Sequence, residues 1–303
     1  MMLKNIKQII KKTLPLMMMI MTVFFTSCEK DITIDLPESE EKIVVEGWIE
    51  QGEYAKIILT KNSPYFSVVD SIALTKLIIT DATITVSDGQ IKEVIKTPTV
   101  NPNYFPPLVY TGSTLKGEIG KTYYLKIEVE GKTLTAVTTI PKPIIYDKIW
   151  FEVEQPKGDS LGLVWAQYSD PPETKNFYRI FTKRVNNDRK FIPIFFSVYD
   201  DIYFNGKTLT FNMYRGFETM TDDTQFEEDK YDEIGYFKLG DTIIVRSCSI
   251  DKAHYDFWRT IENEIYSGGN PFSTNVPVVS NIKGGGIGIW GGYGATYDTV
   301  IAK

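Results

Sequence analysis

The sequence of 303 residues is poor in the side chains that most often carry catalysis or bind metals, with one histidine, His254, and two cysteines, Cys28 and Cys248. His254 and Cys248 alone are too few ligands for a zinc site. A Ser-His-Asp hydrolase would have to be built on His254, and neither G-x-S-x-G nor H-E-x-x-H occurs. We therefore expect a structural role for His254, with a metal or catalytic role as the alternative, and no cofactor.

The N-terminal region lacks an apolar run long enough to span a bilayer, although a shorter apolar stretch precedes Cys28. Lys4, Lys7, Lys11 and Lys12 stand before it without any acidic residue. The stretch from Leu14 to Thr26 is about 13 residues long, whereas a bilayer-spanning helix needs about 20. A basic segment, a short apolar segment and the ending Ser27-Cys28 are typical of a lipoprotein signal peptide over residues 1–27. The alternative is an ordinary secretory signal in which Cys28 is incidental.

Acylation of Cys28 would anchor the chain to a lipid bilayer without spanning it, because two or three acyl chains hold a protein firmly. Cys248 would then be the only thiol, so no intrachain disulfide is expected. Residues 28–42 are mostly charged and are predicted to be a tether, although Ile32, Ile34 and Leu36 also fit a short edge strand.

Basic residues are fewer than acidic residues, 33 against 39. Removal of the four leader lysines leaves 29 against 39, a net charge near −10. Nucleic acid is therefore an unexpected partner, since binding to phosphates needs a basic surface.

The remaining sequence is rich in Tyr, Phe, Thr, Val and Ile, which favour strands. Short alternating segments with frequent turns predict a mainly β fold of two tandem immunoglobulin or fibronectin-III-like β-sandwich domains. Pro141-Lys142-Pro143 interrupts the pattern, which places an N-terminal β-sandwich at 43–142 and a C-terminal β-rich domain at 143–303. The predicted strands include 43–49, 55–60, 82–86, 91–95, 123–129, 134–140, 148–153, 161–166 and 177–181.

An aromatic insertion between Phe191 and Phe217 is the best candidate for a binding surface, and Asn205-Gly206 is predicted to be a hairpin turn within it. The alternative is that these rings fill the core, which is ordinary for sheets. The candidate ligand-binding residues of the insertion are Phe195, Tyr199, Tyr203 and Tyr214.

A glycine-rich segment, 284–294, contains the spacing G-x-G-x-x-G at Gly286, Gly288 and Gly291. No helix pattern follows it, and no acidic residue lies about 20 positions further on, so a dinucleotide site is not expected. The glycines are predicted to let a final strand or loop pass close under a helix, with Trp290 and Tyr293 covering the gaps. A ligand platform made of Trp290 and Tyr293 is the alternative.

One amphipathic helix is predicted from Lys252 to Tyr266, with Asp251 as its N-cap, packed on the sheet. The acidic run at 222–233 is interpreted as a solvated loop, with calcium binding as the alternative. Catalysis by carboxylates alone, as in glycosidases, stays open.

A series of short motifs runs along the chain: Cys28-Glu29-Lys30, Asp35-Leu36-Pro37, Val44 to Ile49, Thr60 to Phe66, Asp81 to Val86, Gly240-Asp241-Thr242, Tyr255 to Arg259, and Asn281-Ile282-Lys283-Gly284-Gly285 to Tyr297-Asp298. Their order resembles the Bacteroidota outer-membrane lipoprotein family catalogued as domain of unknown function 4249. The resemblance implies an outer-membrane lipoprotein, often found with TonB-dependent transporters, and no assigned activity. The acidic residues of Glu29-Lys30-Asp31 partly resemble those of surface-exported lipoproteins, which implies a cell-surface orientation.

The leading hypothesis is a non-enzymatic, membrane-anchored accessory lipoprotein that binds a ligand or partner beside a TonB-dependent transporter, the ligand being a nutrient, a peptide or a glycan. It predicts a concave aromatic surface in the second half of the chain. A structural or assembly lipoprotein of the outer membrane is the second hypothesis, and a carboxylate-based hydrolase is the third.

Overall fold

A computed structural model describes residues 40–63, 71–154, 160–216, 233–267 and 277–303, all of which belong to one compact unit, Glu40–Lys303. The predicted signal peptide, Cys28 and the tether up to residue 39 lie outside the described residues. None of the helices in the described ranges is long and apolar enough to cross a membrane.

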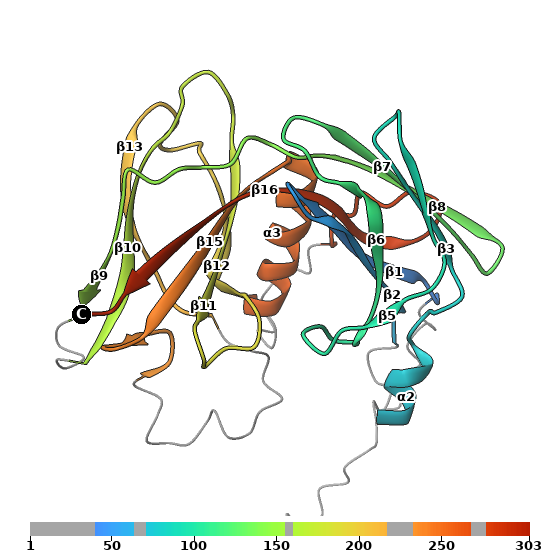
Figure 1. Ribbon diagram of the computed structural model, residues 1–303, viewed down its shortest axis with the longest axis horizontal. Coiled ribbons are helices and arrows are strands. Elements are labelled where there is room, and N and C mark those ends of the chain that lie inside the picture. Colours follow the sequence, from blue (N-terminus) through green and yellow to red (C-terminus); the bar gives the residue numbers. More distant parts are fainter. Residues whose placement is uncertain (1–39, 64–70, 155–159, 217–232, 268–276) are drawn as a thin grey trace, which may run out of the picture. The chain divides into compact units, whose positions relative to one another are not determined.

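The fold is mainly β with several sheets, as the sequence predicts (Figure 1). Alternation of buried and exposed side chains explains the strands: in β7 (Thr122–Val129), Tyr123, Leu125 and Ile127 are buried while Lys126 is exposed. The other long strands are β1 (Ile43–Glu50), β2 (Tyr54–Lys61), β6 (Leu108–Lys116), β8 (Lys132–Thr139), β10 (Leu161–Ser169), β11 (Phe177–Arg184), β12 (Ile192–Asp200), β15 (Thr242–Ile250) and β16 (Ile287–Ile301). The shorter elements are α2 (Ser71–Lys76), β3 (Thr83–Ser87), β4 (Lys92–Ile95), β5 (Thr99–Val100), β9 (Lys148–Val153), β13 (Thr208–Met213) and β14 (Phe237–Lys238).

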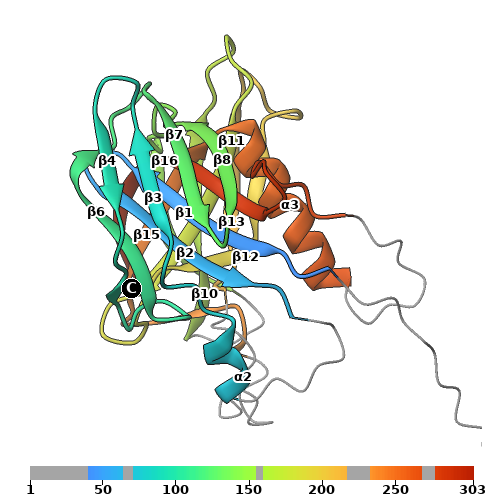
Figure 2. The ribbon, with the colours of Figure 1, turned by 90° about the vertical axis from the view of Figure 1, so that its right-hand side faces the viewer.

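An eight-stranded sheet with the order β12-β11-β15-β16-β1-β2-β6-β5 runs through both halves of the unit. Its centre is β16, which pairs with β15 on one side and, in parallel, with β1 on the other. The predicted interruption at Pro141-Lys142-Pro143 does fall between β8 and β9. The sheet nevertheless continues across it, because the last strand of the chain lies beside the first (Figure 2).

Each half of this sheet is covered by a second sheet. In the N-terminal half, the sheet β4-β3-β7-β8 closes a core of buried residues that includes Val45, Ile127 and Trp290. In the C-terminal half, β10 pairs with β9, β13 and β14 to form a layer that faces β12, β11, β15 and β16 (Figure 1). A core that includes Val164, Ile180 and Val245 lies between these two layers.

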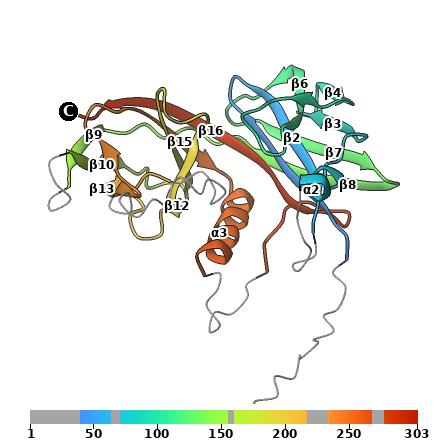
Figure 3. The same cartoon turned by 90° about the horizontal axis from the view of Figure 1, so that it is seen from below.

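The predicted amphipathic helix is confirmed as α3 (Lys252–Ser267), which Figure 3 shows beside β16. Asp251 is its N-cap, because its carboxylate accepts a hydrogen bond from the His254 amide at 2.9 Å. The same carboxylate accepts from the Thr138 hydroxyl at 2.5 Å, which ties the start of the helix to β8.

The steric interpretation of the glycine-rich segment is also confirmed. A Cβ at Gly291 would lie 2.3 Å from the ring of His254, and one at Gly294 would lie 2.0 Å from the carbonyl oxygen of Pro141. Only glycine lets β16 pass this close to α3 and to the chain after β8. The predicted hairpin at Asn205-Gly206 is wrong, because the strands that flank this turn pair with different partners, β12 with β11 and β13 with β10.

Candidate functional site

An aromatic cavity of about 290 Å³ lies within the C-terminal half, between the two layers of the sandwich. Its walls come from β10, β11, β12 and β13, from the segment before β9 and from the turn before β13. Because side chains alternate along a strand, the inward residues of facing strands meet there. The lining residues are Ile144, Tyr146, Tyr168, Tyr178, Ile180, Tyr199, Phe204, Leu209, Phe211 and Asn212.

The aromatic rings of the cavity contact one another mostly edge to face. The centroids of Tyr168 and Tyr178 are 5.6 Å apart at 80°, and those of Tyr146 and Phe211 are 6.0 Å apart at 65°. Phe204 stacks on Tyr178 at 6.3 Å. Rigid rings in such arrangements keep their positions but do not close every gap, so an open space between them persists.

A chain of hydrogen bonds fixes two of the tyrosines. The Tyr178 hydroxyl donates to the buried carboxylate of Asp170, and the hydroxyls of Tyr168 and Tyr178 lie 3.2 Å apart. A phenol hydroxyl can donate one hydrogen bond. Because Tyr178 donates its hydrogen bond to Asp170, Tyr168 must be the donor between Tyr168 and Tyr178. Asp170 also accepts from the Gly206 amide at 3.2 Å, which holds the turn before β13 against the cavity.

The phenols are neutral at physiological pH. Burial, and then the hydrogen bond to Asp170, raise the pKa of Tyr178 far above its usual range. Burial likewise raises the pKa of Tyr146 and that of Tyr199. Since none of the lining residues carries a charge, the cavity presents an apolar surface with a few uncharged polar groups.

The sequence predicted one of these residues as a ligand contact, Tyr199. Phe195 instead packs with Phe196 and Tyr266 on the surface, with ring centroids 4.6 and 4.7 Å away. Tyr203 lies in the turn and is 88% exposed, while Tyr214 contacts Tyr236 at 5.8 Å. The structure therefore does not bring Phe195, Tyr203 and Tyr214 into the cavity.

Trp290 and Tyr293 do not form a ligand platform, because both are buried. The Trp290 indole donates to the carbonyl of Tyr123 at 3.1 Å, and Gly47 leaves room for its ring. The Tyr293 hydroxyl accepts from Arg179 at 2.9 Å beneath α3. Both rings cover the gaps beside the glycines, which is the role that the sequence favours.

The main residues that the sequence analysis missed are Tyr146, Tyr168 and Tyr178. Tyr168 follows the alternation of buried and half-buried residues in β10, so its burial had a visible signal, whereas β11 is buried on both faces from Phe177 to Thr182. The sequence gives no signal that Tyr168 and Tyr178 contact each other, because β10 and β11 belong to different sheets. Phe204 and Phe211, by contrast, belong to the predicted aromatic insertion.

His254 and Cys248 are structural residues. Burial, and then the nearby Arg179, lower the pKa of His254 well below its usual value, so the ring is neutral. Burial raises the pKa of the Cys248 thiol to about 12, which makes it a poor nucleophile. Within the described ranges no group of three or more His, Cys, Asp or Glu side chains could hold a metal ion. Most of the acidic run at 222–233 lies outside them.

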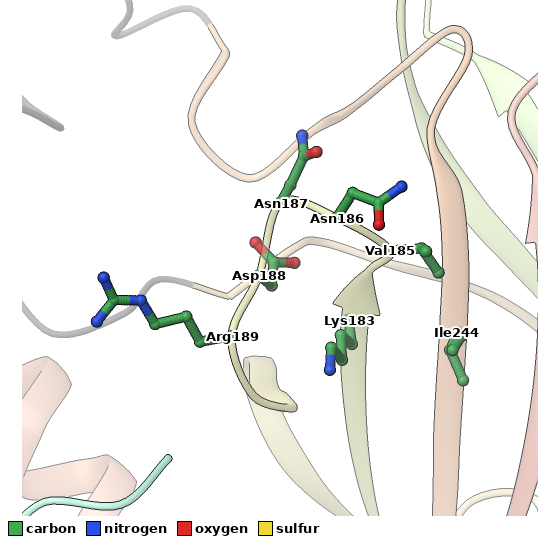
Figure 4. Close-up of a pocket in the computed structure, with 7 residues that line it drawn as sticks. All are labelled: Lys183, Val185, Asn186, Asn187, Asp188, Arg189 and Ile244. Atoms are coloured by element: carbon green, nitrogen blue, oxygen red, sulfur yellow. The ribbon is translucent and has the colours of Figure 1, made fainter. Parts of the chain in front are cut away.

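A second hollow of about 400 Å³ lies at the loop between β11 and β12 (Figure 4). Asp188 closes this loop, since its carboxylate pairs with Arg184 at 2.7 Å. The lining mixes polar and charged residues with Val185 and Ile244 and has no aromatic ring, and Figure 4 shows the Arg189 side chain extending away from Ile244. The aromatic cavity is therefore the better candidate for binding a small molecule.

The family model described as Domain of unknown function (DUF4249) matches residues 29–298. No curated protein matches the chain.

Proposed function

The chain belongs to the DUF4249 family, a domain of unknown function, and we propose that it is a lipid-anchored accessory protein that binds a small uncharged molecule. The aromatic cavity is the observation that carries this proposal. A TonB-dependent transporter of the outer membrane is the proposed partner.

The size and lining of the cavity define the class of ligand. An engineered cavity of about 150 Å³ lined by apolar side chains binds benzene. At about 290 Å³ the aromatic cavity has room for a molecule of roughly bicyclic size. A charged ligand would lose its hydration without gaining a counter-charge from any lining side chain, so an uncharged ligand is favoured.

Hydrogen bonding adds a second requirement. The Tyr146 hydroxyl accepts from Ser247 at 2.7 Å and keeps its own proton available. The Tyr199 hydroxyl has no hydrogen-bond partner in the part of the chain that the structure describes. Two phenol donors in an apolar cavity favour a ligand with a carbonyl, ether or hydroxyl oxygen that can accept.

The sequence supports the proposed location. The segment before Cys28 supports a cleaved lipoprotein signal and an acylated Cys28, and the family resemblance supports an outer-membrane, cell-surface placement beside a TonB-dependent transporter. A protein held there would take up a small molecule and present it to the transporter. No enzymatic step is part of this proposal.

Titration of 2-naphthol, an uncharged bicyclic phenol, into the purified protein tests the cavity by calorimetry. We expect one molecule to bind, and Leu209→Trp, which fills the cavity from its wall, to weaken binding at least about tenfold. Leu239→Trp is the matched control, because Leu239 is exposed and outside the cavity. Absence of binding, or equal binding by both variants, would overturn the proposal.

The anchor and the partner need a separate test. Purification of the lipidated protein from membranes in mild detergent is expected to bring down a TonB-dependent transporter. Cys28→Ala is expected to release the mature chain from the membrane fraction. A preparation without any transporter would remove the partner from the proposal, and a fully membrane-bound Cys28→Ala variant would remove the anchor.

A further inference from the structure

The outer face of the sheet formed by β9, β10 and β13 carries a regular set of six side chains, and Asn212 is the only one of these six residues that also borders the cavity. Ile149, Phe151, Val164, Ala166 and Phe211 point to the core. Because side chains alternate along strands, their neighbours in sequence point outward. Strand pairing places Lys148, Gln167 and Thr210 in one row, and Trp150, Trp165 and Asn212 in the next. We call these six residues the tryptophan face.

Two indole rings form the centre of the tryptophan face. Trp150 and Trp165 are directly opposite each other in the pairing of β9 and β10. Their ring centroids are 6.3 Å apart and their planes differ by 18°, so the rings are nearly parallel. Both residues are half-buried, which leaves part of each ring in contact with solvent.

Polar groups surround the indoles. The Trp150 indole N–H donates to Glu152 at 3.3 Å, and the Lys148 ammonium lies 4.5 Å from the centre of the Trp150 ring. The amide side chains of Gln167 and Asn212 and the hydroxyl of Thr210 flank Trp165 without making side-chain hydrogen bonds to other described residues. Amides and hydroxyls both donate and accept, so each suits a partner rich in hydroxyl groups.

We propose that the tryptophan face binds a neutral carbohydrate chain. A sugar ring presents C–H groups on its faces, which pack on an indole, and hydroxyl groups around its edge, which bond to amides and hydroxyls. Of the two charged side chains that contact Trp150, Lys148 is positive and Glu152 is negative, so their charges balance beside the indoles and do not favour an acidic polymer.

This carbohydrate site is separate from the aromatic cavity. Trp165 points outward from β10, whereas its neighbours Val164 and Ala166 belong to the core between the layers. A substitution on one side of the sheet can therefore remove one site and leave the other. The carbohydrate proposal and the cavity proposal fail independently.

Affinity electrophoresis of the full-length protein in detergent tests the carbohydrate site. The gels contain soluble xyloglucan, galactomannan, starch or, as an anionic comparison, polygalacturonate. We expect at least one neutral polysaccharide to retard the protein, and Trp165→Ala to weaken this binding at least about tenfold. Tyr203→Ala, at an 88% exposed aromatic residue, and Leu209→Trp in the cavity are expected to bind like the unmodified protein.

A second variant guards against loss of folding. Trp165→Phe keeps a smaller ring at the same position and is expected to give intermediate retardation, with an unchanged circular dichroism spectrum. Retardation by polygalacturonate alone would overturn the neutral class of ligand. Lack of retardation by every neutral polysaccharide, or equal retardation of Trp165→Ala and the unmodified protein, would overturn the site and leave a protein partner as the occupant.

Discussion

The two halves of the molecule use aromatic side chains in different ways. In the N-terminal half, Tyr110, Tyr123 and Trp290 are almost fully buried in a mainly aliphatic core. Their polar atoms bond to the backbone: Tyr110 donates to the carbonyl of Ile79 at 3.3 Å, and Tyr123 donates to that of Lys116 at 3.2 Å. In the C-terminal half, Tyr146, Tyr168 and Tyr178 of the aromatic cavity bond to other side chains.

This difference separates a structural use of aromatic rings from one that permits binding. A hydroxyl that satisfies a buried backbone group cannot be diverted to a ligand without a large cost in free energy. A hydroxyl that bonds to another side chain can exchange that partner. Ile, Val and Leu make up most of the N-terminal core, whereas aromatic rings make up most of the cavity lining in the C-terminal half.

The largest expected effect is at the core of the N-terminal half. Trp290→Ala removes a fully buried ring and its hydrogen bond to Tyr123, and we expect the free energy of unfolding to fall by about 3–5 kcal/mol. Denaturant unfolding followed by circular dichroism measures it. Phe204→Ala, at a half-buried ring of the cavity, is the comparison and should cost clearly less. Equal losses would mean that the two halves are packed alike.

The second effect concerns acid stability, which we expect to depend on the N-terminal half. The buried carboxylate of Glu93 accepts hydrogen bonds from the amides of Ser113, Thr114 and Leu115 at 2.5, 2.9 and 3.0 Å. Burial alone would raise the pKa of Glu93, but these bonds outweigh it and lower the pKa below its ordinary value of 4.5. The charged form is therefore stabilised in the folded state.

Because the folded pKa of Glu93 is lowered, its contribution to stability is present above about pH 4.5 and is lost as the pH falls through the folded pKa. Glu93→Gln should lower the free energy of unfolding at pH 7 by about 1.5–3 kcal/mol, the range for hydrogen bonds to charged groups. It should also flatten the decline in stability below pH 4.5. Glu128→Gln, at an exposed residue, is the control. A decline in stability below pH 4.5 that is as steep in Glu93→Gln as in the unmodified protein would contradict the assignment.

A matched pair of substitutions tests the packing of the two halves directly. Ile127→Phe adds volume to a closed core and should cost about 1–3 kcal/mol of unfolding free energy. Ile180→Phe adds the same volume beside the aromatic cavity, where empty space can take the ring, and should cost close to nothing. Thermal unfolding of both variants gives the comparison. A larger loss for Ile180→Phe would show that the cavity cannot accept a new ring.

Local sequence patterns predicted β1 to β4, β7 to β11, the helix and the reason for the glycines of β16. Each of these depends on neighbours within a few residues, such as the alternation in β7 or the Asp251 cap of α3. The parallel pairing of Val44 with Ile287 depends on residues far apart in the chain, and no local pattern specifies it. The continuous sheet was therefore not foreseen.

The sequence predicted an aromatic binding surface in the second half of the chain, but it identified only some of the residues that line the cavity. The aromatic insertion contains Tyr199, Phe204 and Phe211, which do line it. Tyr203 stands next to Phe204 but lies on the exposed side of the turn. The hydrogen bond from Gly206 to Asp170 fixes that turn, and a sequence cannot show which two of its residues will be held together across sheets.

The smallest expected effect tests the direction of the hydrogen-bond chain in the cavity. If Tyr168 donates to Tyr178, then Tyr168→Phe removes one bond between neutral groups and should cost about 0.5–1.5 kcal/mol of unfolding free energy. Tyr178→Phe removes the hydroxyl that donates a hydrogen bond to the Asp170 carboxylate, and it should cost more, about 1.5–3 kcal/mol. The reverse order, measured by denaturant unfolding, would mean that Tyr178 donates to Tyr168 and that Asp170 is satisfied by other groups. A larger loss for Tyr178→Phe than for Tyr168→Phe would agree with a hydrogen bond from Tyr178 to Asp170. The hydroxyls of Tyr146 and Tyr199 would then be the donors that the cavity offers to a ligand.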